Sequence, residues 1–135
     1  MSWESYHRRN EIIDGVLSEV DGTGRAEIPT RWRWAIAEAF GGQQAFLVAL
    51  HYRWLNTLTA RLDAVLESSA DDLATDARRV RRELAVERPA LWALLCAHAG
   101  HPGLSAAREV ERQRFGWLGI DPAWWADKPH AELVA

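Results

Sequence analysis

The stretch from Gln43 to Glu67 constrains the fold more than any other part of the chain, because it predicts one helix as long as a small domain. Its apolar residues recur at intervals of three and four positions, which is typical of a helix and not of a strand. They are Leu47, Leu50, Trp54, Leu58, Leu62 and Val65. At a rise of about 1.5 Å per residue, this helix would be roughly 35–40 Å long. The other segments are therefore expected to pack around this ridge.

The remaining chain predicts further helices, separated by glycine, proline or serine breaks. Further helices are expected at 3–20, 29–40, 72–87, 90–99 and 104–115, followed by a short turn after Asp121-Pro122. The first has an apolar stripe of Trp3, Tyr6, Ile13, Leu17 and Val20, with Asn10 in the same line. The segment 90–99 is apolar nearly all round, which favours a central position. We predict an all-α, compact irregular bundle of about five helices and a C-terminal turn, with one domain over 1–127 and an exposed tail over 128–135.

Composition restricts the class of protein. The chain has 135 residues, of which 48% are hydrophobic and 26% charged, as in a globular domain. No apolar run is long enough to span a bilayer, and the first residues do not form the apolar core of a secretory signal. One cysteine, Cys96, suits a reducing compartment, so we expect a cytoplasmic protein. Lys128 is the only lysine among many arginines and alanines, which suggests a GC-rich bacterial genome.

Two sets of side chains predict surfaces that bind a partner. One is the basic run on the outer face of the predicted helix 72–87, and the other is a group of tryptophans near the C-terminus. They are Arg78, Arg79, Arg81 and Arg82, and Trp117, Trp124 and Trp125. Arginine and tryptophan often anchor interfaces. The sequence therefore favours a non-enzymatic interaction or regulatory module that binds another protein or a second copy. In an alternative reading the tail folds back and buries its tryptophans.

Nucleic-acid binding by the arginine face is a weaker alternative. The net charge is −3, and no helix-turn-helix, zinc-finger or aromatic RNA-binding pattern accompanies the basic run. Catalytic signatures such as Gly-x-Ser-x-Gly, His-Glu-x-x-His, a Walker lysine or a dinucleotide fingerprint are also missing from the sequence. The sequence thus offers no positive argument for an enzyme.

Two polar residues on apolar stripes suggest either a core network or a pocket. His51 lies on the long ridge, and Asn10 lies on the stripe of the first helix. Buried polar groups need hydrogen-bond partners, so the two could satisfy each other or bond to nearby backbone. Alternatively they mark a small pocket with Trp54 and Trp92 as walls and His98 close by. That reading predicts a bundle that binds a small ligand or metal.

Two short clusters have the residue types of metal ligands. The first is Glu4, His7 and Glu11, and the second is Cys96, His98 and His101. Carboxylate and imidazole groups one turn apart can share a metal in helical bundles, but such sites need a second pair on a facing helix. A closed zinc site needs four ligands. Since both clusters fall short of these sets, we expect no cofactor and interpret them as a solvated helix face and a helix end.

Overall fold

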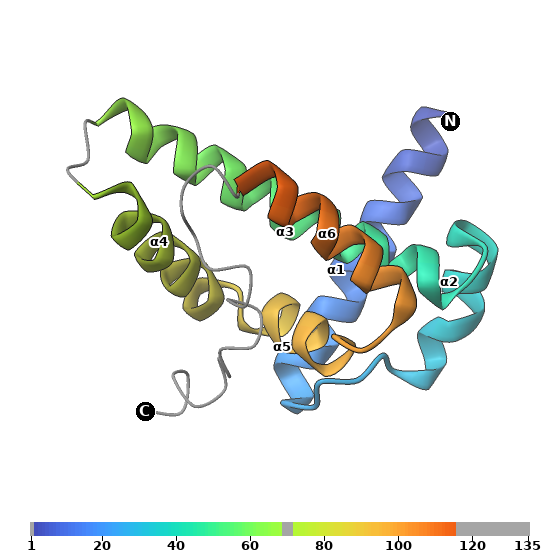
Figure 1. Cartoon of the computed structure of the whole chain (residues 1–135). Coiled ribbons are helices and arrows are strands. Elements are labelled where there is room, and N and C mark those ends of the chain that lie inside the picture. The colour runs from blue at the N-terminus through green and yellow to red at the C-terminus, as the bar shows by residue number, and fades with distance from the viewer. Residues whose placement is uncertain (1, 69–71, 116–135) are drawn as a thin grey trace.

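The computed structural model describes residues 2–68 and 72–115, and the secondary structure in this part is entirely helical (Figure 1). The all-α prediction is confirmed. The elements are α1 (Trp3–Thr23), the 3₁₀ turn η1 (Thr30–Trp32), α2 (Arg33–Phe40), α3 (Gln43–Glu67), α4 (Leu73–Glu87), α5 (Pro89–Ala97) and α6 (Pro102–Phe115). The predicted C-terminal turn and tail lie outside the described residues.

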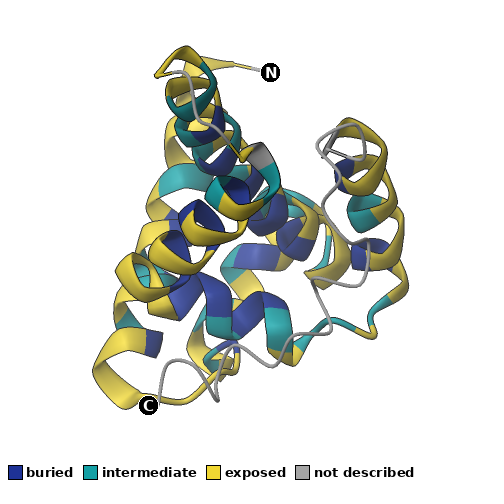
Figure 2. Ribbon diagram, turned by 60° about the vertical axis from the view of Figure 1, so that its left-hand side comes forward, coloured by how far each residue is buried: buried dark blue, intermediate teal, exposed yellow. Residues whose placement is uncertain are grey.

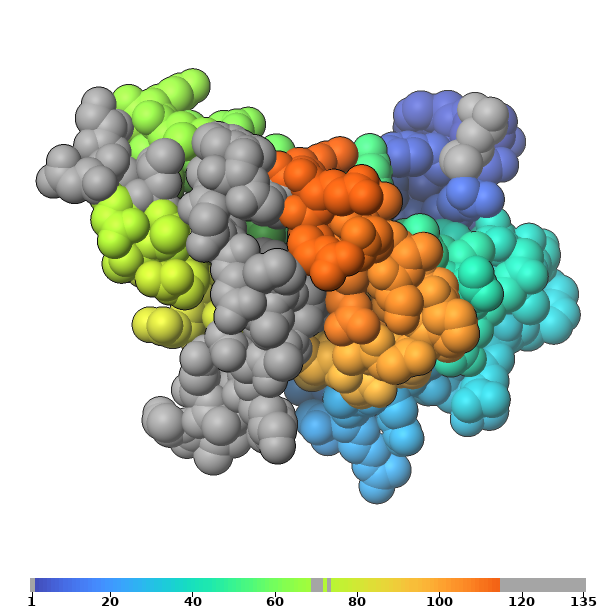
Figure 3. Space-filling view, in the orientation of Figure 1, coloured from blue at the N-terminus to red at the C-terminus, as the bar shows by residue number. Residues whose placement is uncertain are grey.

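Helix α3 is the axis of the bundle, as its length predicted. It packs against α2, α4, α5 and α6, and α6 lies along its middle (Figure 1). The buried residues of α3 are Phe46, Leu47, Leu50, His51, Trp54, Leu55, Leu58 and Leu62. These positions recur every three to four residues, so one broad stripe of the helix faces the core. In the space-filling view, α6 (orange) occupies the centre of the face shown (Figure 3).

Polar caps and glycines determine where the helices begin and end. The Ser2 side chain accepts a hydrogen bond from the backbone N–H three residues later, and Asp72 does the same at the start of α4. Such N-caps satisfy N–H groups that the helix itself cannot bond. At the other ends, Gly24 and Gly41 adopt left-handed φ values of 70° and 84°. Only glycine reaches this conformation readily, so α1 and α2 stop there.

The Trp32 side chain connects η1 to α1 by a hydrogen bond and by packing. Its indole Nε1 donates to Glu19 Oε2 at 2.7 Å, and Arg31 Nε donates to the same oxygen at 2.8 Å. These bonds, first to Arg31 and then to Trp32, lower the pKa of Glu19. The indole ring lies directly over Gly15, where an added Cβ would be 2.5 Å from two ring carbons. A glycine in the middle of α1 thus makes room for the ring.

The predicted stripe of α1 is only partly buried. Ile13 and Val20 lie in the core, whereas Trp3 and Tyr6 are 73% and 61% exposed. The bundle therefore covers the predicted apolar stripe only beyond the first two turns of α1. The reason is geometric, because the N-terminal part of α1 projects beyond α2 and α3, and its first turns are exposed (Figures 1 and 2).

Helix α5 is buried in the centre, as its uniform apolarity predicted. Its buried residues are Ala90, Leu91, Trp92, Leu94 and Leu95, and it contacts α1, α3 and α4. Figure 2 shows the buried positions of the bundle facing inward and the exposed ones facing out. In the part of the chain that the structure describes, no helix has the length and apolarity needed to cross a membrane.

Candidate interaction groove between α1 and α3

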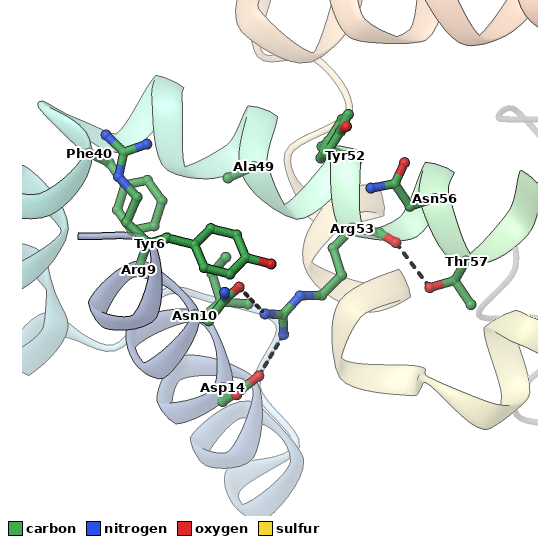
Figure 4. A pocket seen from close by; sticks show the side chains of 11 residues that line it. Tyr6, Arg9, Asn10, Asp14, Phe40, Ala49, Tyr52, Arg53, Asn56 and Thr57 are labelled. Atoms are coloured by element: carbon green, nitrogen blue, oxygen red, sulfur yellow. Dashed lines mark hydrogen bonds and ion pairs between the residues drawn. The ribbon is translucent and has the colours of Figure 1, made fainter. Parts of the chain in front are cut away.

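A surface groove of about 540 Å³ lies between α1 and α3 (Figure 4). Helix α1 contributes residues at positions 6, 9, 10, 13 and 14, and α3 contributes residues at 49, 52, 53, 56 and 57. Both sets follow helical spacing, so each helix turns one continuous face toward the groove. Phe40, at the end of α2, completes the lining. The groove is therefore a trough between two helices with one end contributed by α2.

The base of this α1–α3 groove is apolar and its edges carry two tyrosines. Ile13, Phe40 and Ala49 supply the apolar lining, and Ile13 belongs to the core. Tyr6 on α1 and Tyr52 on α3 both line the groove, and both are 61% exposed. Tyrosine combines a large apolar ring with a polar tip, and such side chains are enriched at interfaces. The groove thus offers apolar contact area beside hydrogen-bonding groups.

A bridge across the groove joins α3 to α1. Arg53 Nη1 donates to Asp14 Oδ1 at 2.6 Å, and Arg53 Nη2 donates to Asn10 Oδ1 at 2.9 Å, as Figure 4 shows. The guanidinium charge is neutralised by Asp14, and the two helices are held at a defined separation. Paired charged hydrogen bonds of this kind specify geometry as well as adding stability.

Arg9 supplies the unneutralised charge of the groove. Its Nε donates to the Ala39 carbonyl at 2.9 Å, and its guanidinium carbon lies 5.2 Å from the centre of the Phe40 ring. Within the described part of the chain, its two terminal amino groups make no hydrogen bond or ion pair. A second cavity of about 260 Å³ also has Arg9 in its lining, together with Arg8 and Glu38. The Arg9 side chain is therefore fixed in place while part of its donor capacity stays available.

His51 lies in the core and faces α6. Its Nε2 is 3.6 Å from Glu111 Oε1, and both side chains are almost fully buried. Asn10, by contrast, bonds to Arg53 in the groove. The suggested pairing of Asn10 with His51 is therefore wrong, because the two residues lie on different sides of α3. His51 is held by an ionisable partner from a helix 60 positions later in the chain.

The predicted walls of the core pocket are in direct contact. The rings of Trp54 and Trp92 lie 4.7 Å apart between their centroids. The indole N–H of Trp54 is buried and has no hydrogen-bond partner among the described residues. His98 sits at the end of α5, where its Nδ1 donates to the Leu94 carbonyl at 2.9 Å. The structure thus separates Asn10, in the groove, from these core and helix-end residues.

The arginine face of α4 differs from the prediction at one position. Arg81 is 1% exposed, and its guanidinium carbon lies 5.9 Å from the centre of the Trp92 ring. It follows Ala77 by four residues and therefore falls on the buried stripe of α4. Arg78, Arg79 and Arg82 are exposed, and Arg79 pairs with acidic neighbours on its own helix. The predicted surface tryptophans Trp117, Trp124 and Trp125 lie outside the described residues.

The two candidate metal clusters make local contacts. His7 Nε2 is 3.6 Å from Glu11 Oε1, and the His7 ring stacks on Trp3 at 5.0 Å. Glu4 is exposed one turn earlier. Among the described residues, no three His, Cys, Asp or Glu side chains are grouped so that they could hold a metal ion.

The second cluster is divided between a helix end and a turn. His101 Nδ1 accepts the backbone N–H of Gly103 at 3.1 Å. Burial raises the pKa of the Cys96 thiol to about 11, although the nearby Arg81 and Arg108 oppose this shift. The thiol is therefore protonated near neutral pH. A thiolate ligand for a metal would first have to lose this proton.

Sequence reasoning missed the groove, because its lining comes from the polar face of α3 and from α1. The signal that could have found it is Tyr52, a large aromatic residue on the otherwise polar side of the long helix.

Comparisons of the chain with protein-family models, with curated proteins and with solved structures found no match. The argument for function therefore depends on the geometry of the groove.

Proposed function

We propose that this protein is a helical interaction module that binds a segment of another protein in the groove between α1 and α3. The observation that carries the proposal is the open groove itself, about 540 Å³ in volume, with exposed tyrosines on both edges and a fixed arginine. The composition of the chain and its single cysteine favour a cytoplasmic location for this activity.

The groove has the residue types that contribute most to interfaces. Tyrosine and arginine are enriched among residues whose loss weakens binding strongly. Tyr6 and Tyr52 would each lose solvent-exposed ring area on binding, while Arg9 already has its side chain fixed by Ala39 and Phe40. A side chain that is ordered before binding loses less conformational entropy when the partner arrives. Part of the groove is thus already ordered before a partner binds.

The other hypotheses have weaker support. A ligand that binds His51 would have to compete with Glu111, because Glu111 Oε1 already lies 3.6 Å from Nε2 of the imidazole. Nucleic-acid binding by α4 would use its arginine face. Arg81 is buried and does not contribute to this face, and Arg79 is paired with Asp76. These contacts reduce the positive charge available to phosphate groups.

Site-specific photocrosslinking tests the proposal. A photoreactive phenylalanine analogue replaces Tyr52 in the groove, or Val86, which is equally exposed at 61% on α4, as the matched control. After irradiation in the source organism, we expect discrete protein adducts from position 52 and none of the same adducts from position 86. The reason is that only the first probe lies inside the groove.

A second substitution tests whether the crosslinked adduct forms by binding in the groove. Ala49→Leu adds bulk to the apolar lining while leaving the charges unchanged, and Ala49 is only half-buried, so the fold should tolerate it. We expect this change to reduce the adduct from position 52 by about tenfold, the effect of roughly 1.4 kcal/mol. Identical adducts from positions 52 and 86, or no adduct from position 52, would refute the proposed function.

A further inference from the structure

We infer that the occupant of the α1–α3 groove is an amphipathic helix with an apolar ridge and a carboxylate beside it. This inference rests on the proposed function and specifies the partner. It follows from the shape of the groove, from the kind of backbone the groove can accept and from the charge it carries.

The shape of the groove suits two turns of a helix. Its lining extends from position 6 to 14 on α1 and from 49 to 57 on α3. Eight residue steps at the helical rise correspond to about 12 Å, the length over which a bound helix presents anchors at i, i+3 or i+4, and i+7. The walls are themselves helical faces, so the ridge of a third helix can lie along them, over the Arg53 bridge, as in a helical bundle.

An extended segment would fit less well. A bound strand gains most of its affinity from backbone hydrogen bonds to the edge of a sheet. The described residues form no strand, and the groove is lined by side chains of helices whose backbone groups are already bonded internally. A helix satisfies its own backbone groups and needs only side-chain contacts from the groove. The groove therefore selects a helical partner.

The charge of the groove selects an acidic partner. Arg8, Arg9 and Arg53 line the groove or the adjoining cavity, together with two carboxylates, Asp14 and Glu38. Three cations against two anions leave one positive charge. Arg53 is neutralised by Asp14, so the excess is associated with Arg8 and Arg9. A carboxylate on the partner can reach the available amino groups of Arg9, whereas a lysine there would be repelled.

Two matched synthetic peptides test this inference. Both are alanine-based helices with leucines at i, i+3, i+4 and i+7, and they differ only in carrying glutamate or lysine beside the ridge. The full chain, labelled with ¹⁵N, is titrated with each peptide, and the amide shifts are followed by NMR. We expect shifts concentrated at the lining positions of α1 and α3. We also expect the glutamate peptide to bind roughly five-fold more tightly, as for an exposed ion pair.

Asn56 offers a variant that tests charge without disturbing the core. It is exposed and lines the groove, so Asn56→Glu adds a negative charge there while the fold is kept. We expect it to remove or reverse the preference for the glutamate peptide. Gln113→Glu, the same change of charge at an exposed position on α6, should leave the preference intact. Equal affinity for the two peptides, or a preference that Asn56→Glu does not alter, would overturn the inference.

The crosslinks at position 52 show whether only this inference fails or whether the proposed function fails as well. The adducts are digested and the partner segment is identified by mass spectrometry. An acidic segment with apolar residues at helical spacing supports the inference. Binding of neither peptide overturns the inference, as does a crosslinked segment that is basic, extended or part of a second copy of this chain. The proposed function would then still stand only if the crosslinked segment belongs to another protein and the Ala49→Leu variant reduces the adduct.

Discussion

Substitution of Gly15 by alanine tests whether the ring of Trp32 really occupies the space above α1. Alanine stabilises a helix interior by about 1 kcal/mol relative to glycine, so the change would ordinarily raise stability. Here the new Cβ would lie 2.5 Å from two carbons of the indole ring. Overpacking of this kind costs about 1–3 kcal/mol. A displaced ring also loses its hydrogen bond to Glu19, which adds to this cost.

The expected outcome for Gly15→Ala is a net loss in the free energy of unfolding. The overpacking cost of about 1–3 kcal/mol less the helix gain of about 1 kcal/mol leaves up to about 2 kcal/mol, and the lost Trp32–Glu19 hydrogen bond adds to this loss. Urea denaturation followed by circular dichroism measures it. Gly22→Ala is the matched control, because it lies in the same helix and its Cβ would meet no atom within 4 Å. This control should gain up to about 1 kcal/mol. Trp32→Leu should relieve the penalty at Gly15. If Gly15→Ala stabilises the protein as much as Gly22→Ala, the packing argument is wrong.

Three further predictions concern ionisable side chains. Because the pKa of Cys96 is raised to about 11, alkylation by iodoacetamide near neutral pH should be about 100-fold slower in the folded protein than in urea, as mass spectrometry would show. Glu19 has a lowered pKa, so its contribution to stability is present above the pKa of the unfolded chain and is lost as the pH falls through the folded value. The stability gap between wild type and Glu19→Gln in urea titrations should therefore close on acidification, and a gap independent of pH would contradict this. His51→Leu should cost about 1–3 kcal/mol because the buried Glu111 side chain loses the imidazole beside it, and a double-mutant cycle with Glu111→Gln should be non-additive.

The sequence predicted the bounds and the burial of the helices well where these depend only on residues within the helix and next to it. The bounds of α3 follow from the glycines before it, the serines that follow it in the sequence and an apolar ridge between them that His51 interrupts. α5 was placed in the centre because it has no polar side to expose. For α1, the stripe was read correctly as helical, but how much of it would be covered depended on where α2 and α3 end. Trp3 and Tyr6 therefore lie beyond the core that their pattern implied.

The candidate site was predicted less well, because its parts are far apart in the chain. Asn10 was recognised as a polar residue needing a partner, and the structure supplies Arg53, 43 positions later. His51 was recognised in the same way, and its partner is Glu111 on the last described helix. Sequence periodicity shows that a polar group is on a buried face, but it does not show which other helix carries the complementary group.

The sequence by itself determined that this protein is a helical bundle, where its long helix runs and which side of most helices is apolar, because helix formation and amphipathic patterning depend on neighbours within a few positions. The tertiary structure alone decided that α1 and α3 stand apart enough to leave a groove, that the Arg9 side chain lines it and that Arg81 is buried. These features depend on how helices distant in the chain cross and on what fills the space between them, and no local pattern encodes that geometry.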